Sequence, residues 1–175
     1  RVFGVLFQNA ALFDDMTTIE NVCFPLVEHR RDLSRRQIIE IARERLRLVG
    51  LESKHFRKLP SELSGGMRKR VGLARALALN PEIILYDEPT TGLDPILTEM
   101  VDDLILTTHN HHVGSTSVVV THDLSAAFRI GDYVAMLDNG KILLFGTPQD
   151  FIDSKIDLVR RFVSKGVRKL EPKPK

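Results

Sequence analysis

Hydrophobic residues along this chain form two kinds of pattern. Largely apolar runs stand at Ile83–Tyr86 and Ser117–Thr121, whereas between residues 34 and 50 apolar side chains recur every three or four positions. An unbroken run is typical of a strand buried on both faces of a parallel sheet. The wider spacing is typical of a helix that buries one face. Strands that alternate with helices in this way predict an α/β fold with a mostly parallel sheet.

Polar residues mark where the predicted helices begin. Thr17 with Glu20, and Ser34 with Gln37, have the spacing of capping boxes, in which a side chain accepts a hydrogen bond from the first helical turn. Two helices are therefore expected to start just after Thr17 and Ser34. Pro25 is expected to limit the first of them, because proline removes a backbone donor and crowds the preceding turn.

Turn signals complete the outline. Gly50 follows the last apolar position of the second helix and is expected to close it. Asn139–Gly140 stands between the apolar segments 132–137 and 141–145, which predicts two antiparallel strands joined by a two-residue turn. The basic residues 165–175 contain two prolines and are expected to form an irregular tail.

Composition narrows the classes of function. The 25 Lys and Arg residues nearly balance 23 Asp and Glu, so no nucleic-acid partner is expected. Cys23 is the one cysteine; it excludes an internal disulfide and is interpreted as a structural thiol in a reducing compartment. No apolar run approaches the roughly 18 residues of a membrane span, and no signal segment is recognised, so a cytoplasmic location is expected.

Two adjacent carboxylates, Asp87 and Glu88, end the run Ile83–Tyr86. Open α/β sheets bind ligands at the carboxyl ends of their strands, and successive strand residues point to opposite sides. In this interpretation Asp87 holds Mg²⁺ through water, while Glu88 orients and deprotonates an attacking water molecule. Solvated charges at a strand end are the alternative interpretation.

Ser64, Gly65 and Gly66 stand at the start of another expected helix. Two glycines let backbone N–H groups approach an anion closely, and the N-terminus of a helix is electropositive. The segment therefore suits a phosphate group, although taken alone an ordinary helix cap is the simpler interpretation.

Gln8 and His122 also follow predicted strands. Because a parallel sheet gathers the carboxyl ends of its strands along one edge, this amide and this imidazole can converge with the two carboxylates on one phosphate. A lone histidine is more often structural. The cluster of His109, His111 and His112 is interpreted as part of a solvated loop rather than as a metal site, because metal ligands need supporting partners.

These motifs occur in the order and spacing of the ABC ATPases, which the chain resembles over nearly its whole length. The corresponding segments are the Q-loop at Gln8, the signature at Leu63–Met67, the Walker B strand at Ile83–Glu88, the D-loop at Thr91–Asp94 and the switch at His122. The signature with Met67 and the segment Val5–Asp14 are most similar to the ATPase subunit of Mla/MCE-type lipid transporters. The resemblance implies a P-loop-NTPase-like core with an α-helical subdomain.

The resemblance also implies roles for single residues. Glu88 is expected to be the general base, Asp87 and Gln8 to serve Mg²⁺, and His122 to contact the γ-phosphate of ATP. Two subunits of such proteins close head to tail as a homodimer, with Asp94 at the interface. The residues expected to bind the nucleotide of the second subunit are Ser64, Gly65, Gly66 and Met67.

Domains and partners follow from the same resemblance. The expected divisions are 1–13 for the first core strand and Q-loop, 14–79 for the helical subdomain through the signature helix, 80–150 for the ATPase core and 151–175 for a C-terminal helix and basic tail. The helical subdomain is expected to receive a membrane permease at the inner face of the cell membrane, with an MCE-domain substrate-binding protein. The alternatives are the ATPase of another ABC importer or exporter, or a soluble non-transport ABC protein.

One motif of the family is missing from the 175 residues, namely the Gly-x-x-x-x-Gly-Lys-Ser/Thr loop that cradles the phosphates of ATP. The first strands of the fold and this P-loop are therefore expected to precede Arg1. The 175 residues alone are accordingly expected to bind ATP weakly and to hydrolyse little or none.

Overall fold

A computed structural model describes residues 3–111 and 116–167. Its contacts divide the chain into two compact units, Arg1–Val120 and Thr121–Lys175, and each is described by itself. The domain divisions expected from the sequence stay predictions.

Two interpretations from the sequence fall partly outside the described residues. These are the histidine cluster, of which His112 is not described and His109 and His111 are described in their backbone alone, and the end of the basic tail, residues 168–175. The described backbone contradicts both in part, because His109 and His111 lie in the helix Pro95–His111 rather than in a loop, and residues 165–167 belong to the helix Asp157–Val167 rather than to an irregular tail. The parts that fall on residues 112 and 168–175 stay predictions.

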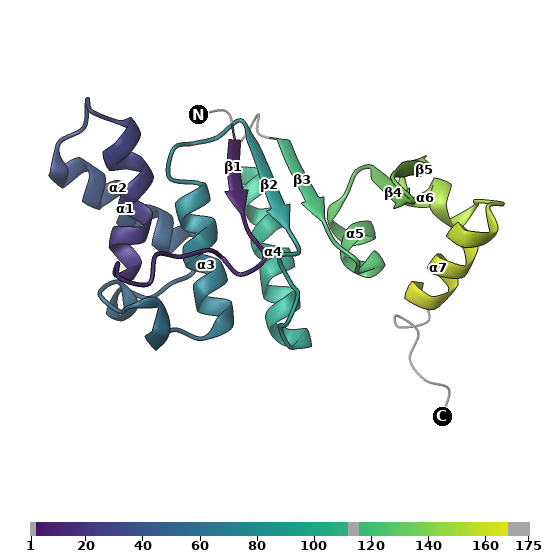
Figure 1. Cartoon of the computed structure of the whole chain (residues 1–175), viewed down its shortest axis with the longest axis horizontal. Helices are drawn as coiled ribbons and strands as arrows, with labels where there is room; N and C mark the ends of the chain where they lie inside the picture. The colour runs from purple at the N-terminus through teal and green to yellow at the C-terminus, as the bar shows by residue number, and fades with distance from the viewer. Residues whose placement is uncertain (1–2, 112–115, 168–175) are drawn as a thin grey trace. The chain divides into compact units, whose positions relative to one another are not determined.

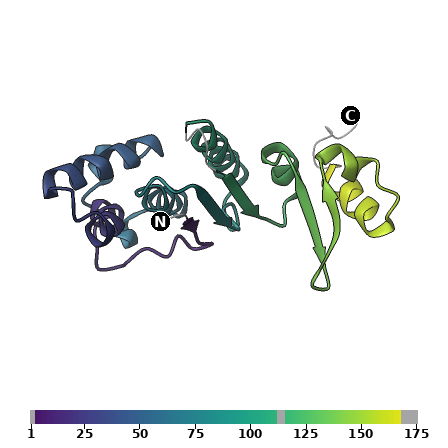
Figure 2. The same cartoon turned by 90° about the horizontal axis from the view of Figure 1, so that it is seen from above.

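Strands and helices alternate along the first unit, and its three strands form one parallel sheet of order β1-β2-β3 (Figure 1). Helix α3 lies between this sheet and the pair α1 and α2, an arrangement that Figure 2 shows from above. The elements are β1 (Phe3–Leu6), α1 (Thr18–His29), α2 (Arg35–Leu48), the 3-10 turns η1 (Ser53–His55) and η2 (Pro60–Glu62), α3 (Gly65–Ala76), β2 (Ile83–Asp87), α4 (Pro95–His111) and β3 (Thr116–Val120). The predicted α/β fold with a mostly parallel sheet is confirmed.

The pairing register brings the ends of the three strands together. Leu6, the last residue of β1, pairs with Tyr86, and Val120, the last residue of β3, pairs with Asp87. Chain segments that leave the three strands therefore start from the same edge of the sheet. Gln8, Asp87 and Glu88 lie at this edge, whereas the other candidate residues of the first unit stand at the starts of α3 and α4.

The expectation that residues 117–121 form a strand buried on both faces is wrong for the described structure. Val118 is 45% exposed and Val120 is 56% exposed. The reason is position, since β3 is an edge strand of the described sheet and pairs with β2 alone. By contrast, Ile84 and Tyr86 in the central strand β2 are fully buried.

Helix α1 also differs from the prediction, because it continues past Pro25 to His29. Its capping box of Thr17 and Glu20 forms as predicted. Beyond the proline, Leu26 is 1% exposed, so the last turn is held by burial of an apolar side chain. A buried leucine contributes about 1.5–3 kcal/mol, which offsets much of the cost of roughly 3 kcal/mol for proline inside a helix.

Helix α3 packs against β1 at very short range. A Cβ atom added to Gly72 would lie 2.9 Å from Cβ of Ala10 and 2.9 Å from Cδ1 of Leu6, and one added to Gly4 would lie 2.6 Å from the carbonyl oxygen of Ala76. Real Cβ atoms do not approach other atoms so closely, so the contact depends on glycine at both positions.

The described part of the second unit, residues 121–167, consists of a hairpin and three helices. Its elements are α5 (Leu124–Ile130), β4 (Val134–Asp138), β5 (Lys141–Gly146), α6 (Pro148–Ile152) and α7 (Asp157–Val167). The two strands are antiparallel, and Asn139 and Gly140 between them have φ angles of 46° and 74°, as the predicted tight turn requires. Phe128 of α5 contacts Phe151 of α6 edge to face. Among the described residues, no helix is long and apolar enough to cross a bilayer.

Replacement of Gly72 by alanine is expected to destabilise the protein. Alanine favours a helix by roughly 1 kcal/mol over glycine, but overpacking typically costs about 1–3 kcal/mol. Here the methyl group meets both Leu6 and Ala10 at 2.9 Å, which favours the upper part of that range. We expect G72A to lower the free energy of unfolding by about 1–2 kcal/mol in urea denaturation. G65A is the matched control, because its Cβ finds no atom closer than 3.8 Å. An unchanged midpoint for G72A would contradict the packing argument.

Candidate functional site

The candidate site begins with two polar residues at the carboxyl ends of neighbouring strands. Asp87 ends β2, and Gln8 lies two residues beyond the end of β1. Because Leu6 pairs with Tyr86 in parallel, both side chains belong to the same edge of the sheet, and both are exposed. An amide and a carboxylate at this edge offer the hard oxygen atoms that Mg²⁺ prefers.

Glu88 does not belong to the strand, although the sequence interpretation treated it as a strand residue that points opposite to Asp87. The strand ends at Asp87, and Glu88 has a φ of 46°, in the left-handed region. Its N–H donates to the carbonyl oxygen of Val120 at 2.9 Å, which ties it to the end of β3. The different direction of Glu88 therefore results from a turn and not from strand alternation.

A hydrogen bond inside this turn holds the carboxylate of Glu88. The hydroxyl of Thr91 donates to Oε2 of Glu88 at 2.8 Å, and the N–H of Thr91 donates to the carbonyl oxygen of Glu88 at 3.3 Å. Glu88 is half-buried, so its carboxylate is held by the chain and still reaches solvent. Such a group can accept a proton from a bound water molecule.

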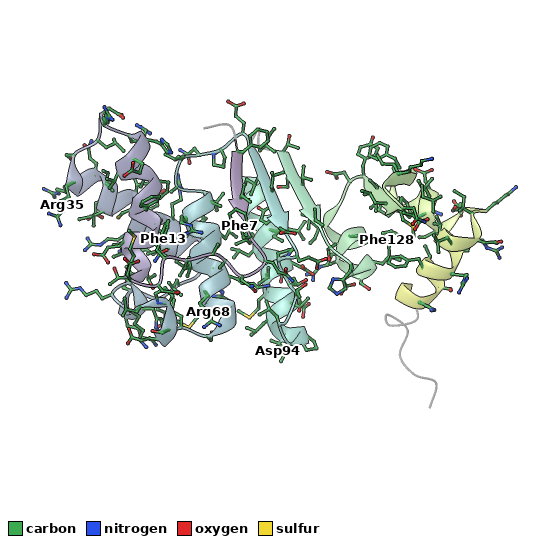
Figure 3. All side chains as sticks on the ribbon, in the orientation of Figure 1. Phe7, Phe13, Arg35, Arg68, Asp94 and Phe128 are labelled. Atoms are coloured by element: carbon green, nitrogen blue, oxygen red, sulfur yellow. The ribbon has the colours of Figure 1, made fainter. Side chains whose placement is uncertain are left out.

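Asp94 follows the turn and caps α4. Its Oδ1 accepts a hydrogen bond from the N–H of Leu97 at 3.0 Å, while the side chain stays exposed. Figure 3 shows Asp94 and Arg68 toward the same side of the first unit, where α3 and α4 both begin. The structure thus shows a capping role and leaves Asp94 accessible.

The Ser-Gly-Gly segment forms the start of α3. Ser64 is the N-cap, and its hydroxyl oxygen accepts a hydrogen bond from the N–H of Met67 at 3.3 Å. A Cβ on Gly66 would meet Leu97 of α4 at 3.3 Å, so this glycine allows the two helices to approach. Ser64 is exposed, and Gly65 and Met67 are partly exposed, so the helix start remains open to an anion.

Lys69 is a residue that sequence reasoning missed. It lies on α3 and is 7% exposed, and its Nζ donates to the carbonyl oxygens of Pro89 at 2.6 Å and Thr91 at 3.0 Å. Burial lowers the pKa of this lysine, and the nearby Glu88 charge opposes that shift. The sequence contained a signal for the burial of Lys69. Its spacing from Gly66 and Leu73 places all three residues on one face of the helix, and this face is buried.

Two further polar residues that the sequence did not single out organise the segment after Gln8. Asn21 is fully buried; its Oδ1 accepts from the N–H of Phe13 at 2.9 Å and its Nδ2 donates to three carbonyl oxygens, those of Phe13, Met16 and Thr17. Arg75 donates to the carbonyl oxygen of Ala10 at 2.8 Å and lies 5.5 Å from the ring centre of Phe13. Burial lowers the pKa of Arg75. Asn21 of α1 and Arg75 of α3 thus both hold the segment that follows Gln8, in which Phe13 is labelled in Figure 3.

His122 belongs to the second unit, whereas the other candidate residues belong to the first. It is exposed and stands two residues beyond the end of β3, just before Asp123, whose Oδ1 caps α5 by accepting from the N–H of Ser125 at 2.9 Å. Its position relative to Glu88 is not given by the structure, so their convergence stays a prediction.

A cavity of about 1020 Å³ lies in the helical part of the first unit, between α1, α2 and η1. Apolar side chains such as Ile19 and Ile38 line it together with five basic residues, Arg35, Arg43, Arg47, Lys54 and Arg57. Cys23 also lines it, and burial raises the pKa of this thiol to about 11, as a structural cysteine requires.

The chain belongs to the ABC transporter family. The model of that family, described as ABC transporter, matches residues 1–91. Solved structures agree with this assignment: a dimeric ATP-binding cassette, MJ0796, described in a post-hydrolysis state bound to ADP and Pi, is 37% identical with a TM-score of 0.74. The similarity covers 83% of this chain and 62% of that one.

Curated relatives come from several transport systems. The "Probable ribonucleotide transport ATP-binding protein mkl" of Mycobacterium leprae is 43% identical over 93% of this chain and 46% of its own length. The "Intermembrane phospholipid transport system ATP-binding protein MlaF" of Haemophilus influenzae is 41% identical over 87% of this chain and 56% of its own length. ProV of Escherichia coli, a glycine betaine/proline betaine transport system ATP-binding protein, is 43% identical over 93% of this chain and 40% of its own length. The chain spans about half the length of the curated relatives it matches.

Truncation of Asn21 is expected to loosen the segment that follows Gln8. N21A leaves the N–H and C=O of Phe13 without their side-chain partner. Loss of a partner costs a buried polar group about 1–3 kcal/mol, and these part-buried groups lose at most that much. We expect faster amide hydrogen exchange at Phe13 and a lower melting temperature. Glu28→Ala, an exposed position on the same helix, is the control and should change neither. Exchange at Phe13 equal to wild type would show that Asn21 does not hold this segment.

Proposed function

We propose that this chain forms part of the ATP-hydrolysing subunit of an ABC transporter, with Glu88 as the general base. The observation that carries the proposal is the carboxylate of Glu88, which Thr91 holds at 2.8 Å at the carboxyl edge of the sheet. Family membership and the neighbouring Asp87 support it. Glu88 orients the attacking water molecule and takes its proton, while its own geometry stays fixed by the turn.

Gln8 and Asp87 are the residues proposed to hold Mg²⁺. The two residues stand at the ends of adjacent parallel strands, both are exposed, and their side-chain oxygen atoms match the hard ligands that this ion takes. Mg²⁺ held there with ATP would supply positive charge to the phosphate oxygens. The side chains of Gln8 and Asp87 orient it, and His122 is proposed to contact the γ-phosphate.

The signature segment is proposed to act on the nucleotide of a second subunit. Its backbone N–H groups at the start of α3, with the hydroxyl of Ser64, suit a phosphate group. The dimeric form of the cassette MJ0796, to which this chain is similar, supports a homodimer. In that assembly Ser64, Gly65, Gly66 and Met67 complete the site of the partner, and Asp94 lies at the interface.

Transport of phospholipid or another lipid is the substrate class that we propose. The relative MlaF of Haemophilus influenzae and the Met67 signature support it. The partners proposed with it are a membrane permease on the helical subdomain, residues 14–79, and an MCE-domain substrate-binding protein, at the cytoplasmic face of the membrane. Transport of a small solute is the second candidate, because ProV of Escherichia coli, a glycine betaine/proline betaine transport system ATP-binding protein, is 43% identical to this chain and MlaF is 41% identical.

The replacement Glu88→Gln tests the catalytic role. It keeps the size and the hydrogen bond from Thr91 but removes the base, so kcat for ATP hydrolysis by the product of the intact gene should fall about 10²- to 10⁴-fold while ATP still binds. Glu82→Gln is the control, because Glu82 is exposed at the opposite end of β2 and should leave kcat unchanged. If E88Q kept more than half of the wild-type rate, Glu88 would not be the base.

Purification from membranes of the native organism tests the proposed lipid system. The gene product should copurify with a permease and an MCE-domain protein, and lipid vesicles should raise its ATPase rate in that complex. Copurification with a binding protein for a small solute, and no response to lipid, would favour the second candidate instead.

A further inference from the structure

The turn that carries Glu88 folds around one buried ammonium group. Lys69 reaches it from α3, and its Nζ lies 2.6 Å from the carbonyl oxygen of Pro89, 3.0 Å from that of Thr91 and 3.4 Å from that of Glu88. A lysine ammonium has three N–H donors, and these three acceptors match them in number. The acceptors all belong to one stretch of four residues, so the cation binds the turn as a unit.

The burial of Lys69 sets this contact apart from an ordinary surface lysine. The residue is 7% exposed, and an ammonium removed from water loses solvation that hydrogen bonds must replace. Desolvation lowers the pKa of Lys69, with the Glu88 charge acting in the opposite direction. Carbonyl oxygens of the turn accept the hydrogen bonds that replace water around the ammonium group. Because all of them bind the same Nζ atom, the bonds hold these carbonyl groups in one arrangement.

The turn needs such a constraint because its first residue is strained. Glu88 is not glycine and yet has a φ of 46°, a region that costs other residues about 1–3 kcal/mol. Its N–H is bonded to Val120 at 2.9 Å and its carboxylate accepts from Thr91 at 2.8 Å. The position of the carboxylate therefore follows from the backbone that Lys69 holds.

Lys69 also belongs to the helix that begins with the signature segment. Gly66 and Lys69 are three residues apart on one buried face of α3, less than a full turn of the helix. A rigid helix thus connects the backbone donors at its start with the carbonyl oxygens around Glu88.

We infer that Lys69 is a positioning residue that fixes the Glu88–Thr91 turn, and with it the carboxylate of Glu88, in the conformation used for hydrolysis. This inference rests on the proposed function of Glu88. Lys69 contacts no reacting atom in this scheme; it acts through the backbone of the turn. Loss of its hydrogen bonds should therefore affect the rate of the chemical step more than the binding of ATP.

The test is Lys69→Met in the product of the intact gene, a change that keeps the length of the side chain and removes the charge. We expect kcat to fall about 10- to 100-fold while KM for ATP changes less than about threefold, since small misplacements of a catalytic group cost this much. Amide hydrogen exchange should rise in residues 88–94 and stay unchanged in β1. The control is Arg70→Met, which removes a cation of the same helix that donates to Gly50 at 3.1 Å, outside the turn.

The two readouts separate failure of this inference from failure of the proposed function. Exchange in residues 88–94 equal to wild type, or a kcat within about twofold of wild type in an active enzyme, would overturn the role of Lys69. An enzyme whose rate survives E88Q would overturn the proposed function. If K69M does not fold, Lys69→Arg is used, and a fall in kcat at constant KM is again expected, because a planar guanidinium cannot point at three convergent oxygens.

Discussion

The close approach of α3 to its neighbours is the constraint on which the rest of the first unit depends. Glycine allows it on both sides, at Gly72 against β1 and at Gly66 against α4. A Cβ atom at Gly66 would require the side chain of Leu97 to give way by a few tenths of an ångström, whereas one at Gly72 would require the helix or its neighbours to shift. Because α3 also begins with Ser64 and carries Lys69, such a movement would displace the candidate anion site and the Glu88 turn together.

Three basic side chains of α3 donate hydrogen bonds to backbone carbonyl oxygens of other segments. Lys69 donates to the turn after β2, Arg70 to Gly50 at the end of the helical pair, and Arg75 to Ala10 after β1. Carbonyl oxygens in such irregular segments lack partners in a sheet or helix, and a cation on a rigid helix satisfies them without another strand. One helix thereby fixes three connections of the unit.

Structural features that depend on residues close together in the chain were predicted well from the sequence. The capping boxes at Thr17 and Ser34, the Asn139–Gly140 turn and the α/β alternation are all present. The order of the motifs also predicted the family, which the match over residues 1–91 confirms. Each of these depends on local backbone preferences or on spacing along the chain, and both can be read from the sequence.

The sequence-based predictions were wrong where the local structure depends on residues that are distant in the chain. Pro25 does not end α1, since burial of Leu26 sustains another turn, and Val118 is exposed because β3 is an edge strand of the described sheet. The left-handed turn at Glu88 was taken for the end of a strand. A local pattern describes what a segment prefers, but packing decides whether the preference is met.

The sequence by itself determined which elements form, in what order, and which polar residues follow the strands. The tertiary structure alone decided how those residues are held. Lys69 donates a hydrogen bond to the carbonyl oxygen of Pro89, which lies 20 positions away in the chain, and Arg75 donates one to the carbonyl oxygen of Ala10, which lies 65 positions away. Such contacts arise when α3 packs on the sheet, so they are set by geometry between elements, for which a periodic pattern in one element carries no information.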